Sequence, residues 1–395
     1  MFKGKSRKVT LPFLIIASGL STAACGLPTP LPSSPTLVAT VAPVGLSIGF
    51  FGALTGPNAQ SGINIDNGVE LAVSQYNQSA KIKVTLVNLD SQGDPDQASQ
   101  LAQKAISDKL VAVVGPAFSG ESFVADPILE QGQIVNVTPS ATNPALAAEG
   151  WKYWHRIVGS DNAQGPAAAQ FIVKRLGSTK VAVIDDGSWY GKSIANSVKS
   201  TLLTLSATVP TSQSINPAAP YYLSTVNAII SSGATSVFFG GYYDAAGRLL
   251  KQLRNAGFKG QFISDDGALD PKLISTAGNS AVSNTYATCP CGDVSTTVQG
   301  RAFTSAYQTM FRSAPGTYSA EGYDAANVIL SAIRAGNRTS NGINSYLASH
   351  TFTGITKRIQ FSSNGDLKGG GIYVYQAEAS SSTFSSLGLV SSLVG

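Results

Sequence analysis

Short, fully apolar segments alternate with stretches of helical periodicity along most of this 395-residue chain, and this alternation constrains the fold more than any other feature. The run LVAVVG at residues 110–115 shows no polar alternation, which is typical of a parallel strand buried on both faces. Residues 62–77 instead repeat apolar side chains every three to four positions, as one face of a helix does. Strands that alternate with helices predict parallel sheets with crossover helices.

The alternation occurs twice, and the sequence therefore predicts two doubly wound α/β lobes with a cleft between them. Helical stretches near 296–312 and 319–335 and strands near Ile359 and Ile372 follow the second unit and must return to one or both lobes. The expected strands of the two units are residues 46–54, 82–90, 110–115 and 134–138, and then 180–184, 209–215, 235–241 and 260–264.

The first residues indicate export. Four basic side chains within residues 3–8 precede a ten-residue apolar run at 11–20, which is too short to span about 30 Å of hydrocarbon. We therefore expect a signal peptide. Small residues then precede Cys25 in STAACG, which resembles the lipobox of bacterial lipoproteins and predicts cleavage that leaves a lipid-bearing Cys25. Plain cleavage at an A-x-A site is the alternative. The proline-rich segment 25–44 is expected to be a semi-rigid tether.

Composition favours a folded body and argues against a nucleic-acid partner. Of the residues, 43% are hydrophobic and 12% are charged, which is typical of a globular protein. The formal net charge is +5, but four of those positive charges lie in the predicted signal peptide, which leaves +1 for the rest. A nucleic-acid surface would need a clustered basic face.

Cys289 and Cys291 form a CPC motif, for which a disulfide in an exported protein is the favoured interpretation. Free thiols are the alternative. A metal site is disfavoured, because about four ligands are needed and the two histidines, His155 and His350, are isolated from the pair.

The stretch DDGSWYGKS, residues 185–193, is similar to a phosphate-binding P-loop but does not fit it. Its glycine spacing is one residue short of G-x-x-x-x-G-K-[ST], and two aspartates at the strand's end would repel a polyphosphate. No G-x-S-x-G elbow or H-E-x-x-H motif occurs, and His155 is expected to be packed rather than catalytic. We therefore expect no enzyme, no cofactor and no metal.

Polar side chains follow the predicted strands, where open α/β sheets bind their ligands. Hydroxyls and amides suit a carboxylate, and a carboxylate with aromatic rings suits an ammonium, so the set predicts a site for a free α-amino acid. Each member alone has a plainer explanation: the hydroxyls as helix caps or turns, Tyr242 as packing, and Asp266 as a turn residue, with Asp265 as a rival. The candidates are Ser119, Ser140 and Thr142 from the first unit, and Tyr190, Tyr242 and Asp266 from the second.

Ordered motifs over nearly all of the chain after the tether resemble the branched-chain (leucine/isoleucine/valine-binding) family of substrate-binding proteins that serve ABC transporters. The segments that carry the resemblance are IGFFGALTGPNAQSG, DPDQASQLAQKAI, VVGPAFSGES, TPSATNPAL, SDNAQGPAAAQFI, DDGSWYGKSIA, FFGGYYDAAGRLLKQLRNAG, SDDGALDP, GYDAANVI and FSSNGDLKGGGIYVY.

The resemblance implies a type I periplasmic-binding-protein fold, whose two lobes are joined by three crossings and close on the ligand by hinge motion. Lobe 1 would comprise residues 45–160 and 290–371, and lobe 2 residues 161–289 and 372–395. Ser119 and Thr142, with the backbone around Ser140, would hold the ligand carboxylate, and Tyr190, Tyr242 and Asp266 would receive the ammonium.

Two departures from the family pattern bear on the ligand. Ser61 stands where some branched-chain binders place an aromatic side chain, and Asp266 replaces the commoner glutamate. Trp189, beside Tyr190, is either a substitute aromatic wall or a rim or core residue.

The function expected from the resemblance is capture of a small amino acid and delivery to an ABC transporter permease, by a monomer lipid-anchored outside the cytoplasmic membrane through Cys25. The alternatives are a related binder of an amide, urea or an aromatic acid, with a sensor as its partner, and an extracytoplasmic enzyme of similar fold.

Overall fold

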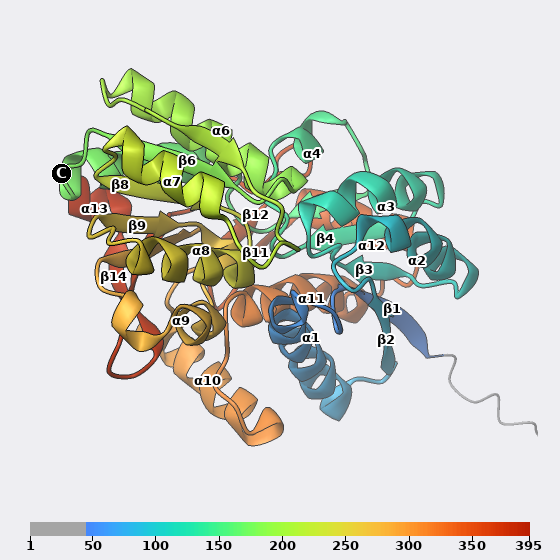
Figure 1. Cartoon of the computed structure of the whole chain (residues 1–395). Coiled ribbons are helices and arrows are strands. Elements are labelled where there is room, and N and C mark those ends of the chain that lie inside the picture. The colour runs from blue at the N-terminus through green and yellow to red at the C-terminus, as the bar shows by residue number, and fades with distance from the viewer. Residues whose placement is uncertain (1–44) are drawn as a thin grey trace, which may run out of the picture. The chain divides into compact units, whose positions relative to one another are not determined.

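The computed structural model describes residues 45–395, which form two sheets with helices on both faces of each (Figure 1). The predicted signal peptide (1–24), the lipidation site Cys25 and the predicted tether (25–44) lie outside the described residues. No helix within 45–395 is long and apolar enough to span a membrane. The predicted α/β fold with two doubly wound lobes is confirmed.

The first sheet has five parallel strands in the order β2-β1-β3-β4-β5. We call this sheet and the helices packed on it lobe 1. The consecutive residues Phe50 and Phe51 are both fully buried, because they point into cores on opposite faces of the sheet. The strands are β1 (Leu46–Gly52), β2 (Val84–Asp90), β3 (Ala112–Val114), β4 (Val135–Thr138) and β5 (Trp154–Arg156). Helices α1 (Ala59–Ser79) and α11 (Ser319–Arg334) cover one face, and α2 (Pro95–Ser107) and α3 (Ser119–Gln131) the other.

The second sheet has seven strands in the order β14-β13-β10-β9-β8-β6-β7, and with its helices it forms lobe 2. The five strands β6 to β10 are parallel, and β13 and β14 add an antiparallel hairpin at one edge. The strands are β6 (Val181–Asp185), β7 (Ser212–Ser214), β8 (Ser236–Gly240), β9 (Gln261–Ser264), β10 (Thr285–Cys289), β13 (Tyr373–Glu378) and β14 (Thr383–Leu389). Helices α5 (Asp161–Gln170) and α6 (Trp189–Thr204) cover one face, and α7 (Leu223–Ser232), α8 (Tyr243–Asn255) and α9 (Pro271–Ala277) the other.

Shorter elements complete the two lobes. A π-helical turn (Phe171–Arg175) continues α5, and a 3-10 turn (Asp266–Ala268) follows β9. The others are α4 (Ala145–Ala148), α10 (Val298–Phe311), α12 (Ser340–Ser349), α13 (Val390–Val394), the small hairpin β11 (Thr351–Thr353) and β12 (Arg358–Gln360), and two further 3-10 turns (Asn279–Ala281 and Val294–Thr296).

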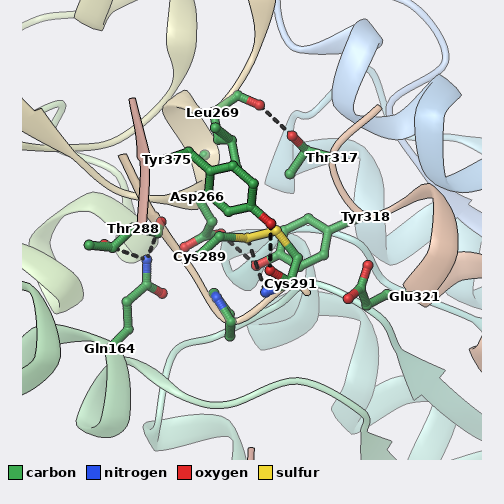
Figure 2. Close-up of a disulfide and its surroundings, with 12 residues drawn as sticks. Gln164, Asp266, Leu269, Thr288, Cys289, Cys291, Thr317, Tyr318, Glu321 and Tyr375 are labelled. Carbon is green, nitrogen blue, oxygen red and sulfur yellow. Dashed lines mark hydrogen bonds between the residues drawn. A yellow bond between two sulfur atoms is a disulfide. The ribbon is translucent and has the colours of Figure 1, made fainter. Parts of the chain in front are cut away.

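The chain passes between the two sheets three times: after β5, after β10 and before β13. The second crossing carries the Cys289–Cys291 disulfide, whose Cα atoms are 5.0 Å apart (Figure 2). Contacts between the lobes join the described residues 45–395 into one compact unit, so the exact lobe boundaries inferred from the sequence stay a prediction.

Both lobes share one strand order, because β7-β6-β8-β9-β10 repeats the 2-1-3-4-5 order of the first sheet. In such sheets the order reverses beside the first strand, and ligands bind there, at the carboxyl ends of the strands. The segments that follow β3, β4, β6, β8 and β9 accordingly border one shared cavity.

Candidate functional site

A small cavity lies between the lobes and is lined by residues of both. Six of the eight ligand-binding candidates from the sequence line it: Ser61, Ser119, Ser140, Tyr190, Tyr242 and Asp266. The other lining residues are Ile65, Ala117, Phe118, Gly267, Leu269, Thr317 and Tyr318.

The lobe 1 side of the cavity is formed by the start of α3. Phe118 and Ser119 line it, and a helix N-terminus presents unpaired backbone N–H groups and the positive end of the helix dipole. The Ser119 hydroxyl oxygen accepts a hydrogen bond from the amide of Asn143 (3.2 Å), and Ser140 donates to the carbonyl of Ala117 (2.7 Å). These bonds fix the segments after β3 and β4 to each other, so this wall is preorganised.

Glu121 lies in the first turn of α3, where an ionised carboxylate would compete with an anionic ligand. It is fully buried and accepts hydrogen bonds from the Ser91 hydroxyl and from the Phe118 amide. Burial raises the pKa of Glu121 to about 8, so the side chain is mostly protonated at neutral pH. The helix N-terminus therefore keeps its positive potential for a ligand.

The lobe 2 side of the cavity presents Asp266, which follows β9 and is 5% exposed. Its two carboxylate oxygens each accept a hydrogen bond of 2.8 Å, one from the Tyr190 hydroxyl and one from the Tyr318 hydroxyl. Figure 2 shows the bond from Tyr318. Burial raises the pKa of both phenols well above their usual range, so they act as neutral donors. Tyr318 comes from the loop before α11, so the carboxylate of lobe 2 is held by one tyrosine from each lobe.

Of the two adjacent aspartates that the sequence left as rivals, only Asp266 lines the cavity. Asp265 is fully buried and accepts a hydrogen bond from the amide of Gly241 at 2.8 Å. Burial first and the charge of Asp266 second raise the pKa of Asp265 well above its usual range. Burial also raises the pKa of Asp266, but the Tyr190 and Tyr318 hydroxyls oppose that rise, so Asp266 is the member of the pair that ionises first.

The aromatic ring of Tyr242 lies between the lobes. Its ring centroid lies 5.3 Å from that of Phe118 in lobe 1 and 5.5 Å from that of Tyr190 in lobe 2. The preceding Gly241 has φ +145°, and a Cβ there would stand 2.4 Å from the carboxyl carbon of Asp186. Glycine at this position lets the chain turn and place Tyr242 in the cavity wall.

In the P-loop-like segment 185–193, backbone amides donate hydrogen bonds to side chains of the same segment. Gly187 N donates to the Asp185 carboxylate (2.8 Å), and Ser188 N donates to that of Asp186 (3.0 Å). The Ser188 hydroxyl in turn accepts from Gly191 N and caps α6. These local bonds orient the start of α6, which carries Tyr190 into the cavity.

Two sequence candidates lie outside the cavity lining. Thr142 is fully buried, its carbonyl accepts from the amide of Asp161, and its hydroxyl has no hydrogen-bond partner within residues 45–395. Trp189 is 60% exposed and packs on Phe123 across the lobes, with ring centroids 4.7 Å apart. The structure thus places Trp189 at the rim, the second of its two interpretations.

Sequence reasoning missed several lining residues, Tyr318 above all. Tyr318 follows no strand, so a rule based on strand ends had no means of finding it. Thr317 was missed for the same reason, Leu269 lies beyond the 3-10 turn that follows β9, and Ile65 was recognised only as part of a helical face. His155, expected to be packed, is buried against Phe361 and bonded to Asn344.

The two α/β lobes have the same strand order, and their strand ends meet at one cavity. The cavity has a carboxylate on one side and a helix N-terminus on the other, an arrangement typical of a two-lobed solute-binding protein. The periplasmic binding protein family model matches residues 45–382, and the chain belongs to this family. The resemblance inferred from the sequence motifs is confirmed.

Relatives and solved structures agree with this assignment. The leucine-, isoleucine-, valine-, threonine- and alanine-binding protein of Pseudomonas aeruginosa is 30% identical over 335 residues, which are 84% of this chain and 89% of that protein. The Leu/Ile/Val-binding protein of Escherichia coli is 32% identical over 239 residues, 60% of this chain and 65% of that protein. The crystal structure of a leucine binding protein from Thermotoga maritima superposes with a TM-score of 0.80 at 25% identity, over 87% of this chain and 98% of that one.

Proposed function

We propose that this protein captures a small α-amino acid with an apolar side chain between its lobes and delivers it to an ABC transporter permease. One observation carries the proposal: the Asp266 carboxylate and the N-terminus of α3 border the same cavity from opposite lobes. A zwitterion is the ligand that matches a negative and a positive pole at once.

The remaining lining accounts for the rest of such a ligand. Asp266 is buried, and a buried carboxylate is stabilised by a cationic partner such as an ammonium group. The rings of Tyr190 and Tyr242 add a favourable surface for that cation. Ile65 and Leu269 supply apolar walls for a side chain. The amino-acid binding named for the relatives supports this choice over urea, an amide or an aromatic acid, which lack an ammonium group for Asp266.

The wider role follows from the family and from the chain's first residues. We propose that lobe 1 (45–160 and 290–371) and lobe 2 (161–289 and 372–395) open and close about the three crossings. The motif before Cys25 supports a lipid anchor that holds a monomer outside the cytoplasmic membrane. In this proposal the protein acts as a carrier, because the groups that line its cavity suit the binding of an amino acid.

A thermal-shift screen followed by calorimetry tests the ligand class. We expect leucine, isoleucine, valine and smaller apolar amino acids to raise the melting temperature, because a ligand that binds only the folded state stabilises it by RT ln(1 + [L]/Kd). Benzoate, urea and short amides serve as controls. Saturable binding of any of these controls, with none by amino acids, would contradict the proposal.

Substitution of Asp266 tests the site. Asp266→Ala is expected to weaken amino-acid binding by a factor of a hundred or more, because loss of one partner of a buried charge pair costs about 3–5 kcal/mol. Asp265→Asn is the matched control: its side chain still accepts from the Gly241 amide, and its affinity should stay within a few fold of wild type. Near-normal affinity of Asp266→Ala in calorimetry would refute the assignment.

A further inference from the structure

A second, larger cavity of about 650 Å³ lies beside the first. We call the two the outer and the inner cavity. Helix α1 runs along both, with Ser61 and Ile65 on the inner and Gln60 and Asn64 on the outer. The outer cavity continues to the second crossing and to β14 of lobe 2.

Three residues line both cavities and so form the wall between them: Leu269, Thr317 and Tyr318. The wall is built from both lobes, because Leu269 follows the 3-10 turn of lobe 2 while Thr317 and Tyr318 precede α11 of lobe 1. The Thr317 hydroxyl donates to the carbonyl of Leu269, and the Tyr318 hydroxyl donates to Asp266 (Figure 2). Two interlobe hydrogen bonds therefore hold the wall in place.

The backbone of Tyr318 also indicates a constrained position. Its φ is 65°, in the left-handed region that non-glycine residues rarely adopt. Such conformations persist where the surrounding structure fixes them, and they cluster at ligand-binding sites. The side chains of Tyr318 and Thr317 are thus held by hydrogen bonds to Asp266 and Leu269 of lobe 2.

We infer that this wall limits the length of the ligand side chain, and that the space beyond it becomes usable when the wall is cut back. The inference rests on the proposed function, in which the amino and carboxylate groups are fixed at Asp266 and α3. An apolar ligand side chain then fills the inner cavity and packs against Ile65, Leu269 and the ring of Tyr318. A longer ligand side chain would collide with the wall.

The test uses the straight-chain amino acids norvaline, norleucine, 2-aminoheptanoate and 2-aminooctanoate in calorimetry with the whole mature protein. For wild type, affinity should fall steeply within this series. Leu269→Ala keeps both wall hydrogen bonds, since Thr317 bonds to the backbone of residue 269. In this variant 2-aminooctanoate should bind at least tenfold more tightly than it binds wild type, because each buried methylene contributes roughly fourfold in affinity, about 0.8 kcal/mol.

Ile65→Ala is the matched control, because Ile65 lines the inner cavity and is not part of the wall that separates it from the outer one. It should not rescue 2-aminooctanoate. Thr317→Ala cuts the wall from lobe 1 and replaces Leu269→Ala as the test should that variant not fold. If affinity fell with ligand length in both wall variants as steeply as in wild type, the inference would be overturned and the proposed function would stand. If wild type binds neither norvaline nor leucine, both fall together.

Discussion

Glu121 links the fold to the chemistry of the cavity at the scale of a single residue. Its protonated side chain closes the first turn of α3 from inside the core, through the Ser91 hydroxyl and the Phe118 amide. A charged carboxylate at this position would oppose the binding of a ligand carboxylate one helical turn away. The same burial that makes the group neutral therefore serves the proposed site.

Glu121→Gln should make the stability of the protein less dependent on pH. The pKa of Glu121 is about 8 in the folded protein and near 4.5 in a model peptide, so its contribution is full below about pH 4.5 and is lost as pH rises toward 8. Between pH 5 and pH 8 this loss amounts to up to about 4 kcal/mol. Glutamine can accept from Phe118 and donate to Ser91, so the variant should equal or exceed wild type at pH 8 in urea unfolding.

Other buried groups make the comparison with wild type necessary. The pKa values of Asp66 and Asp161 are raised to about 7 by burial and change stability in the same direction as Glu121. Burial lowers the pKa of His155 to about 4, so its contribution is present above about pH 6.5 and is lost as pH falls toward 4. If the pH dependence of Glu121→Gln matched that of wild type, Glu121 would be ionised in the folded state.

Reasoning from strand ends placed most of the polar candidates at the cavity, and their ligand-binding role stays a prediction. Asp266, Tyr190 and Tyr242 were found because parallel strands end at one edge of a sheet. The choice between Asp265 and Asp266 needed coordinates, because it depends on which carboxylate turns back to the Gly241 amide. Thr142 also follows a strand, but it is buried and does not line the cavity.

At the scale of elements, the start of α6 is where the lobes meet at the rim. Trp189 packs on Phe123 of α3, and the side-chain amide of Asn143 donates to the Trp189 carbonyl at 3.1 Å. Both contacts join lobe 2 to lobe 1. Opening of the cleft must break them, so Trp189 is placed to report on closure.

Trp189→Phe should remove the change in tryptophan emission that we expect on ligand binding. The chain has three tryptophans, Trp151, Trp154 and Trp189, and only Trp189 contacts the opposite lobe at the rim. Trp151→Phe is the control and should keep the signal. Trp189→Ala should weaken binding about fivefold, since an aromatic pair contributes about 1 kcal/mol. An unchanged emission response in Trp189→Phe would show that this contact does not change between free and bound protein.

The elements that sequence patterns missed share a physical reason. Strand β5 (Trp154–Arg156) is only three residues long, and it is buried although two of its side chains are a histidine and an arginine. Arg156 is accommodated there by a bidentate ion pair with Asp366, at 2.9 Å for each bond, and by carbonyl acceptors. A partner 210 positions away cannot be deduced from local periodicity. Strand β10 was also missed, because its sequence TYATC lacks a run of apolar side chains.

At the scale of the whole molecule, Lys357 lies between two of the three crossings. Its ammonium group is 3.5 Å from the carbonyl of Ile157, on the first crossing, and 3.4 Å from that of Pro290, on the second. The same ammonium group lies 3.5 Å from the carboxylate of Glu321 in α11. The Glu321 side chain is almost fully buried. Pro290 stands between the disulfide-bonded Cys289 and Cys291, so the cation contacts a segment that is already constrained.

Lys357→Met is expected to destabilise the protein by about 3 kcal/mol at pH 8, because it leaves the buried Glu321 carboxylate without its cation. Burial already raises the pKa of Glu321, and Lys357 opposes that rise, so the variant should also become less stable as pH increases. The double variant Lys357→Met with Glu321→Gln should recover most of the loss, since no buried charge remains. Urea unfolding of wild type, both single variants and the double variant measures the coupling. No recovery in the double variant would mean that Lys357 acts through the carbonyls of the crossings instead.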